Sequence, residues 1–431
     1  MTATGAFAHT ALYRDMTTER YPRSPASRTG TDRAVGYGAD RVVGYGADPD
    51  VAVVGGGICG LTAAVALERR GIRPTVYEAA IEYRPVGAGI LLQTNAMLVL
   101  DRLGVAGRIR DAGVPLDGGG LRSVDGAYMS RFDVDGVERE EFGYGFVAVH
   151  RADLQRILLD ELGTEVRTGK DCVDVVGTDP PTARFEDGTA VTPDVLVGAD
   201  GIRSTVRDAV APSVDPRPLD GVAYRALLTL DVPEPYDTRG FEVWGGGTYT
   251  GGSPIDVDRF YWFATAPGPL TDGPASPETL GAALREHLAG YPEPVPALLD
   301  ALDPADVVLT DLEDLPALDT WSRDRVVLAG DAAHAMLPFA GQGAAQAIED
   351  GLALAETVAT HPDPEDAFDA YERERRPRAD RVRRESRRLG RLGTMRSRLG
   401  CRLRNAAIDA VPDAVVRRVR RRRAAGTSLP G

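Results

Sequence analysis

Residues 51–78, VAVVGGGICGLTAAVALERRGIRPTVYE, decide the fold of this chain. The first four residues form an apolar run of the kind that is buried in a parallel sheet. A glycine-rich turn follows, then a helical pattern that ends at Gly71, and then a second strand from Pro74 to Glu78. A strand, a turn, a helix and a strand in fewer than thirty residues predict a Rossmann-like α/β domain.

The turn has the spacing Gly55-x-Gly57-x-x-Gly60, and Glu78 stands eighteen residues after the last glycine. Gly55 permits the tight turn, Gly57 lets the backbone approach a pyrophosphate, and Gly60 lets the helix lie close to the strand. The phosphates then face the positive end of the helix dipole and its free N–H groups. Glu78 can accept hydrogen bonds from the ribose hydroxyls. The pattern predicts a bound dinucleotide, but alone it does not separate FAD from NAD.

Two later motifs add polar groups near strand ends. In residues 197–210, VGADGIRSTVRDAV, a strand ends at a turn that contains Asp200. In residues 330–354, GDAAHAMLPFAGQGAAQAIEDGLAL, Asp331 closes a strand, where its carboxylate can accept from a ribitol hydroxyl. The next helix opens with Gly341-Gln342-Gly343, so a flat ring can lie there with backbone N–H groups near its oxygen.

The three motifs, in this order, resemble those of the FAD-dependent monooxygenases of the aromatic-hydroxylase type, the para-hydroxybenzoate hydroxylase and salicylate hydroxylase-like family. The resemblance covers roughly residues 50 to 375. It implies FAD as cofactor, O2 as oxidant, and NADH or NADPH as a transient co-substrate, since the chain has no second glycine fingerprint. It also implies a C4a-hydroperoxyflavin that hydroxylates or epoxidises a small aromatic or other electron-rich substrate.

The resemblance assigns roles to individual residues. Glu78 resembles the ribose-binding acid, Arg84 an arginine on the adenosine side, and Arg151 an arginine near the pyrophosphate. Tyr224 and Arg203 resemble positions that contact substrate in some members. The expected cofactor-binding residues are Gly55, Gly57, Gly60, Glu78, Arg84, Arg151, Asp200, Asp331, Pro338, Gly341, Gln342 and Gly343.

The hydroxylation chemistry belongs mainly to the cofactor, so the protein needs no acid–base dyad, and none is evident in the sequence. For His334, which stands three residues after Asp331, a structural role is at least as well supported as a chemical one. An aromatic cluster forms either the wall of a substrate pocket or the core of a sheet. Its members are Phe241, Trp244, Tyr261, Trp262 and Phe263.

Composition divides the chain into four parts. Residues 1–49 form an expected disordered tail with a tandem octapeptide, DRAVGYGA then DRVVGYGA. Residues 50–220 and 318–372 are expected to form the FAD-binding domain, with an interleaved substrate-domain sheet over residues 221–317. Basic helices are expected over residues 373–431.

Charge is unevenly placed along the chain. Residues 373–423 hold twenty arginines and five carboxylates, whereas the whole chain has a net charge of −14. An acidic body with a single lysine suggests a halophilic source. A basic amphipathic helix is typical of membrane or nucleic-acid binding. We favour instead a helical cap whose apolar residues pack on the body and whose arginines meet its acidic groups.

Other features narrow the class of protein. The three cysteines have no metal-ligand or disulfide spacing, no apolar run is long enough to span a bilayer, and no secretory signal is evident. We therefore expect a cytoplasmic monomer or homodimer that binds neither metal nor nucleic acid. Two alternatives remain open, an FAD-dependent prenyl-lipid reductase of the same fold and a non-catalytic flavin-binding protein.

Overall fold

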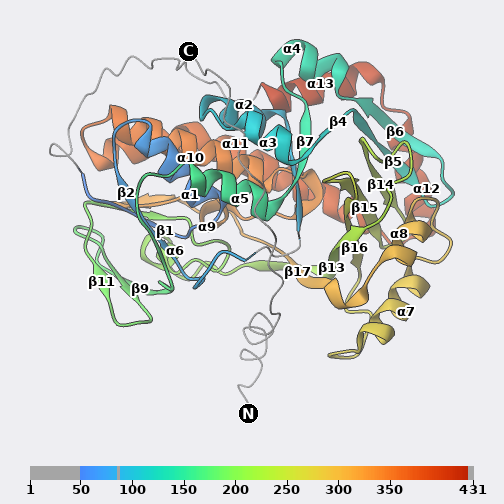
Figure 1. Ribbon diagram of the computed structural model, residues 1–431, viewed down its shortest axis with the longest axis horizontal. Helices are drawn as coiled ribbons and strands as arrows, with labels where there is room; N and C mark the ends of the chain where they lie inside the picture. Colours follow the sequence, from blue (N-terminus) through green and yellow to red (C-terminus); the bar gives the residue numbers. More distant parts are fainter. Residues whose placement is uncertain (1–48, 85–87, 426–431) are drawn as a thin grey trace. The chain divides into compact units, whose positions relative to one another are not determined.

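A computed structural model of the protein describes residues 49–84 and 88–425. The expected N-terminal tail up to residue 48, including its tandem repeat, lies outside the described residues. Helices and strands are mixed throughout the described part, and the predicted α/β class with interleaved sheets is confirmed (Figure 1).

A six-stranded sheet contains the glycine motif. Its strand order is β18-β19-β12-β1-β2-β8, and β18 is the antiparallel member at one edge. All four residues of β1 are buried, as expected for a central parallel strand. The strands are β1 (Val51–Val54), β2 (Pro74–Glu78), β8 (Val166–Thr168), β12 (Val195–Gly198), β18 (Ser322–Arg323) and β19 (Val326–Leu328).

Two helices rich in small residues pack tightly beside this sheet. Helix α1 (Ile58–Glu68) is buried along nearly its whole length and lies against α10 (Gly343–Thr360). A Cβ at Gly351 of α10 would lie 2.7 Å from the backbone N of Ala63, so only glycine permits this approach. Three further helices complete this side, α2 (Thr94–Arg102), α3 (Ala106–Ala112) and α5 (Arg151–Asp160).

A seven-stranded sheet forms the second large layer, in the order β17-β13-β16-β15-β14-β5-β6. It draws strands from two distant parts of the chain, because β14 pairs in parallel with β5. The sheet therefore includes residues 118–133 as well as the region expected from sequence. Its strands are β5 (Gly118–Ser123), β6 (Tyr128–Asp133), β13 (Arg217–Thr229), β14 (Arg239–Trp244), β15 (Tyr249–Pro254), β16 (Arg259–Ala266) and β17 (Val308–Asp314).

The two faces of the seven-stranded sheet have different neighbours. One face packs on α7 (Pro277–His287) and α8 (Val295–Ala301), which supply Leu284, Leu298 and Leu299 to an apolar core (Figure 1). The other face lines a cavity that also contacts the six-stranded sheet's glycine turn. Alternation along each strand decides which side chains reach the cavity.

Two small sheets complete the described strands. One holds β9 (Cys172–Val176), β10 (Thr182–Phe185) and β11 (Ala190–Val191), with a turn at Asp187-Gly188 in which Gly188 has φ +84°. The other holds β3 (Gly89–Leu92), β4 (Val114–Leu116) and β7 (Phe146–His150). Strand β7 leads directly into α5, so Arg151 stands at the start of that helix.

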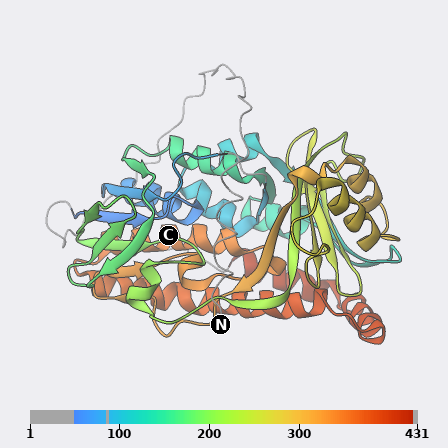
Figure 2. The ribbon, with the colours of Figure 1, turned by 90° about the horizontal axis from the view of Figure 1, so that it is seen from below.

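The C-terminal region is helical, in three segments: α11 (Pro364–Gly393), α12 (Arg398–Asp409) and α13 (Asp413–Ala424). Helix α11 extends from the helices beside the six-stranded sheet to the seven-stranded sheet (Figure 2). Arginines of α11 and α13 pair with acids of the body, Arg387 with Asp314 and Arg420 with Glu138.

The expectation for the apolar residues of these helices is only partly correct. Leu389 packs against the body, whereas Leu399 and Leu403 are 68% and 64% exposed. A sequence pattern shows that one helix face is apolar but not what covers it. Within the described residues, no helix combines the length and apolar character needed to cross a bilayer.

Candidate active site

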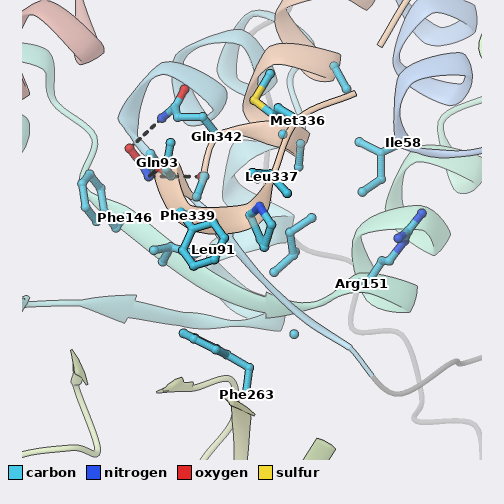
Figure 3. A pocket seen from close by; sticks show the side chains of 18 of the residues that line it. Ile58, Leu91, Gln93, Phe146, Arg151, Phe263, Met336, Leu337, Phe339 and Gln342 are labelled. Carbon is cyan, nitrogen blue, oxygen red and sulfur yellow. Dashed lines mark hydrogen bonds between the residues drawn. The ribbon is translucent and has the colours of Figure 1, made fainter. Parts of the chain in front are cut away.

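One cavity of about 1030 Å³ runs from the glycine turn of β1–α1 to the cavity face of the seven-stranded sheet. Figure 3 shows Ile58 and Arg151 on one side and Phe263 of the sheet at another end. Ten of the twelve expected cofactor-binding residues line it, namely Gly55, Gly57, Glu78, Arg151, Asp200, Asp331, Pro338, Gly341, Gln342 and Gly343.

In the glycine turn, backbone segments approach one another so closely that no side chain fits between them. Gly55 has φ +105°, and a Cβ there would lie 2.3 Å from the carbonyl oxygen of Ala199. A Cβ at Gly60 would lie 1.9 Å from the carbonyl oxygen of Gly55. Gly60 therefore lies between the helix and the strand and does not line the cavity. Its lack of a side chain lets α1 pack close to β1, which places the N-terminus of α1 at the cavity.

The N-terminus of α1 faces the cavity, and no side chain among the described residues neutralises the positive end of its helix dipole. No side chain caps it, its first turn has no acidic residue, and a Cβ at Gly57 would meet nothing within 4 Å. Nearby, Glu78 Oε2 accepts from Gly56 N at 2.7 Å, and Oε1 accepts from Ala80 N at 2.8 Å. Free helix N–H groups beside an oriented carboxylate suit a phosphate and a ribose.

Two aspartates, Asp200 and Asp331, line this cavity. Burial raises the pKa of Asp200, although this carboxylate accepts from Ser204 Oγ at 2.5 Å and from Thr205 N at 2.8 Å. Burial also raises the pKa of Asp331. The side chain of Asp331 is accessible from the cavity, but the surrounding protein removes much of the bulk water from around its carboxylate. The Arg151 cation acts in the opposite direction on Asp331, so these two groups are electrostatically linked.

The loop before α10 is held by amide side chains. Gln342 Nε2 donates to Gln93 Oε1 at 2.6 Å, and Gln93 Nε2 donates to the carbonyl oxygens of Ala340 and Gly341 (Figure 3). Asn95 Nδ2 donates to Gln342 Oε1 at 3.0 Å. The start of α2 therefore orients the loop, and loop residues Leu337 and Phe339 present apolar surface to the cavity.

A buried charge network fixes this loop from behind. Asp350 on α10 accepts from His334 Nε2 at 2.5 Å, from Gly330 N at 2.9 Å and from Arg375 Nε at 2.7 Å. His334 is 1% exposed and does not line the cavity. Its place in the network supports the structural role rather than a chemical one.

Glu349 completes the network beside Asp350. Glu349 forms an ion pair with Arg375. It also accepts from Arg378 Nε at 2.6 Å and from Arg378 Nη2 at 2.7 Å. Asn95 Nδ2 also donates to Glu349, at 2.5 Å. Helix α11 thus supplies the cations, α10 the anions, and α2 the link to the loop.

Comparison with known proteins identifies this arrangement. The family model of FAD-binding domains matches residues 48–247 and 311–386. The chain belongs to this FAD-binding domain family. It is 35% identical over 318 residues to an aurachin C monooxygenase/isomerase of Stigmatella aurantiaca, covering 72% of this chain and 80% of that protein. It is 36% identical over 331 residues to a 3-amino-4-hydroxybenzoate 2-monooxygenase of Streptomyces platensis, covering 74% and 82% respectively.

A solved structure agrees with this assignment. The crystal structure of Klebsiella pneumoniae HpxO complexed with FAD and uric acid has a TM-score of 0.80 and 28% identity, covering 88% of this chain and 98% of that one. The protein is therefore an FAD-dependent monooxygenase, an oxidoreductase of the aromatic-hydroxylase type. The free α1 N-terminus and Glu78 show that the residues present fit FAD.

Besides Gly60, two of the expected site residues do not line the cavity. Arg84 is exposed and pairs with Glu82 at 2.5 Å. Tyr224 is 1% exposed and packs among apolar residues on the α7–α8 face of the sheet, where its hydroxyl accepts from Leu270 N at 2.7 Å. The substrate-contact expectation for Tyr224 is corrected, because strand alternation directs its neighbours Ala223 and Arg225 to the cavity instead.

The other substrate-contact candidate, Arg203, lines the cavity and pairs with Glu313 at 2.9 Å. The aromatic cluster is divided between the two faces of the sheet. Trp244, Tyr261 and Phe263 line the cavity, whereas Trp262 packs on the α7–α8 side. Phe241 belongs to both groups, because it stacks on Phe260 in the core and also reaches the cavity. Both interpretations of the cluster were therefore correct for part of it.

The structure also reveals a carboxylate–phenol pair that the sequence analysis missed. Tyr249 Oη donates to Glu242 Oε1 at 2.8 Å, and both residues line the cavity. A signal was present in β14, since Glu242 stands between Phe241 and Val243, two residues of the α7–α8 core. A single acid between core positions of a strand must face the opposite side.

Proposed function

We propose that this monooxygenase uses NADH or NADPH and O2 to hydroxylate a phenolic or heteroaromatic substrate that carries an apolar extension. One observation carries the proposal, namely that a single cavity joins the dinucleotide motifs to an aromatic face of the seven-stranded sheet. When bound, FAD supplies electron transfer from the nicotinamide and the activation of O2. The protein must then position the substrate ring and exclude water.

The aromatic side chains around the cavity support a planar substrate. The Tyr249 ring centroid lies 4.8 Å from that of Phe263 and 5.3 Å from that of Phe339 in the loop before α10. Offset and tilted rings at such separations attract a further ring through both burial and quadrupole terms. A substrate ring in contact with Phe339 would lie beside the loop expected to hold the isoalloxazine.

The size of the substrate follows from the other end of the cavity. Beyond the sheet, the cavity wall includes Val411, Val415, Val416 and Val419 from α13 and the turn before it. Arg420 and Arg423 of α13 also line it, and both form ion pairs, with Glu138 and Glu385 respectively. Val415 is 47% exposed, although it lies on this wall. Apolar residues left uncovered along a cavity favour an apolar ligand group, at about 25 cal/mol per Å² of apolar surface buried.

The cofactor-binding roles follow from the same geometry. In the proposal, the α1 N-terminus holds the pyrophosphate, Glu78 the ribose and Asp331 the ribitol. Arg151 balances the negative charge of phosphate and aspartate. Gln342 and its amide partners keep the loop rigid against the flavin ring.

NAD(P)H oxidation by the purified holoprotein tests the proposal. Phenols, hydroxyquinolines and aminohydroxybenzoates are supplied with and without an alkyl chain, in dilute buffer and in molar salt, and peroxide is quantified. We expect substrate-stimulated oxidation with little peroxide and a product heavier by one oxygen atom. Members with the alkyl chain should have KM values at least tenfold lower.

A matched variant sharpens the size argument. Val415→Asp should raise KM for the alkylated member and leave the KM of its unsubstituted analogue nearly unchanged. Equal KM values for both members in the native protein would contradict the apolar extension. Flavin reduction without oxygen transfer to any aromatic compound would contradict the substrate class itself.

A further inference from the structure

We propose that Tyr249 and Glu242 form a proton-accepting pair that ionises the hydroxyl or ring N–H group of the bound substrate. The inference rests on the proposed function, because it concerns the same aromatic substrate. Tyr249 is the catalytic residue that touches the substrate, and Glu242 is the positioning residue that receives the proton of Tyr249.

The position of the pair supports this assignment. Tyr249 lies on β15 and Glu242 on the neighbouring β14, both on the cavity face of the seven-stranded sheet. Tyr249 also contacts Phe339, which belongs to the loop expected beside the flavin ring. A substrate ring stacked in this region would therefore present its hydroxyl near the phenol oxygen of Tyr249.

The surroundings of Glu242 leave its carboxylate without a charge partner. Within residues 49–84 and 88–425, no arginine or lysine forms an ion pair with it. Burial raises the pKa of Glu242, and the Tyr249 hydrogen bond opposes this only in part. Arg423 on α13 also acts in the lowering direction through space, but its own ion pair is with Glu385.

The groups that face Tyr249 reinforce the direction of proton transfer. Burial raises the pKa of Tyr249 well above its ordinary value, and the Glu242 charge raises it further. Tyr261 on β16 acts in the same direction, while Arg225 on β13 lowers the pKa of Tyr261. Tyr249 therefore stays protonated in the free protein. It gives its proton to Glu242 only when it accepts a proton from the substrate, as a relay between substrate and carboxylate requires.

A polar group beside the pair lacks a partner. The Trp244 Nε1–H group lies near the Glu242 carboxylate and lowers its pKa, but it is outside hydrogen-bond geometry. Trp244 is 5% exposed and lines the cavity, and Arg404 lies over its ring. A buried donor without an acceptor is costly, so a substrate oxygen at this position would satisfy it.

The proton movement balances without any other reagent. The substrate O–H bond breaks, its electron pair stays on the substrate oxygen, and the proton forms a new O–H bond at Tyr249. In the same step the original Tyr249 O–H bond breaks and its proton binds Glu242 Oε1. The resulting anionic ring is richer in electrons, which favours electrophilic attack by oxygen. After the product leaves, Glu242 returns its proton to solvent.

A purely structural pair is the competing explanation, with the hydrogen bond tying β14 to β15. That role predicts altered stability but no change in how rate or ligand ionisation depends on pH. The pH profile and the ionisation state of a bound phenol therefore separate the two explanations.

The test uses 4-nitrophenol, whose anion absorbs visible light, in difference spectra against the holoprotein alone. We expect the native protein to bind the anion at pH 6, and Glu242→Gln and Tyr249→Phe to bind the neutral phenol. Hydroxylation of the best phenol from the substrate panel should fall about 10²-fold or more in both variants. Native kcat should decline as the pH falls through the raised pKa of Glu242, and Glu242→Gln should lack that decline.

Tyr224→Phe is the matched control, since it removes a phenol oxygen from the opposite face of the same sheet. It should bind the anion like the native protein. Native protein that binds no anionic probe at pH 6 overturns the proposal, as does an unchanged acid limb in Glu242→Gln. If the probe ionises but no aromatic compound is hydroxylated, the pair stands and the proposed substrate class fails.

Discussion

Carboxylates inside this protein occur in two contrasting environments. Burial alone would raise the pKa of Asp350, but the charges of His334 and Arg375 and their hydrogen bonds bring it to about 2. Glu349 is equally buried, and Arg375 and Arg378 hold its pKa below the ordinary value. Glu242 has a phenol partner instead of a cation, and its pKa is raised.

The difference separates groups that hold the fold from groups available for chemistry. Asp350 and Glu349 have no exposure and their acceptor oxygens are occupied by arginines, amides and backbone. Glu242 is open to the cavity and retains capacity for a proton. A carboxylate whose charge is neutralised by arginine is a poor base, whereas one destabilised by its surroundings takes up a proton readily.

The largest effect should come from removing the cation at the centre of the first group. Arg375→Met leaves Glu349 and Asp350 with fewer partners, and we expect a loss of about 3–5 kcal/mol in the free energy of unfolding. Urea denaturation measures it. Arg376→Met is the matched neighbour, because Arg376 is about one-third exposed, and it should cost less than about 1 kcal/mol. Equal losses would remove the distinction between the buried network and ordinary ion pairs.

Acid should weaken the first group by a smaller amount. The pKa of Asp350 is lowered in the folded state, so its contribution is fully present above the unfolded pKa of about 3.9 and is lost as the pH falls toward about 2. The contribution is on the order of 2 kcal/mol. The stability difference between native protein and Asp350→Asn should therefore shrink between pH 6 and pH 3. A constant difference would contradict the lowered pKa.

Removing the hydroxyl of the buried Tyr224 should have a smaller effect on the free energy of unfolding. Tyr224→Phe loses the hydrogen bond from Leu270 N, and we expect a cost of about 1 kcal/mol with kcat unchanged. Thermal unfolding and steady-state kinetics measure both quantities. A fall in kcat of tenfold or more would return Tyr224 to the substrate site and contradict the face assignment.

The smallest effect should be a gain of stability at high pH, when Glu242 is replaced by glutamine. The pKa of Glu242 is raised in the folded state, so the unfolded chain gives up its proton first and native stability falls as pH rises above the unfolded value. Glu242→Gln should match the native protein near pH 4 and be more stable at pH 8. A variant less stable than the native protein at pH 8 would show that the carboxylate contributes to folding.

Much of the cofactor-binding region could be predicted because its residues obey local rules. Gly55 requires a positive φ, β1 is apolar throughout, and α1 begins where the glycine pattern places it. The loop that contains Gln342 was predicted in the same way. Its partners Gln93 and Asn95 were not, since they lie about 250 residues earlier and no periodicity connects the two segments.

The substrate side was less predictable for a different physical reason. Tyr224 and Arg225 are adjacent, yet one packs on α7–α8 and the other lines the cavity. Alternation shows that they face opposite sides, but it does not say which side holds the cavity. That choice depends on where α7, α8 and the six-stranded sheet pack, and on the long-range pairing of β14 with β5.

The sequence by itself determined the dinucleotide fold, because glycine conformations, strand apolarity and spacing act within a few residues. The family and FAD followed from the resemblance of its three motifs to those of a known family. Only the tertiary structure decided which aromatic residues reach the cavity, that α13 forms part of its wall, and that Glu242 meets Tyr249 there. These outcomes depend on contacts between segments far apart in the chain, whose free energy exists only once the sheets and helices have packed together.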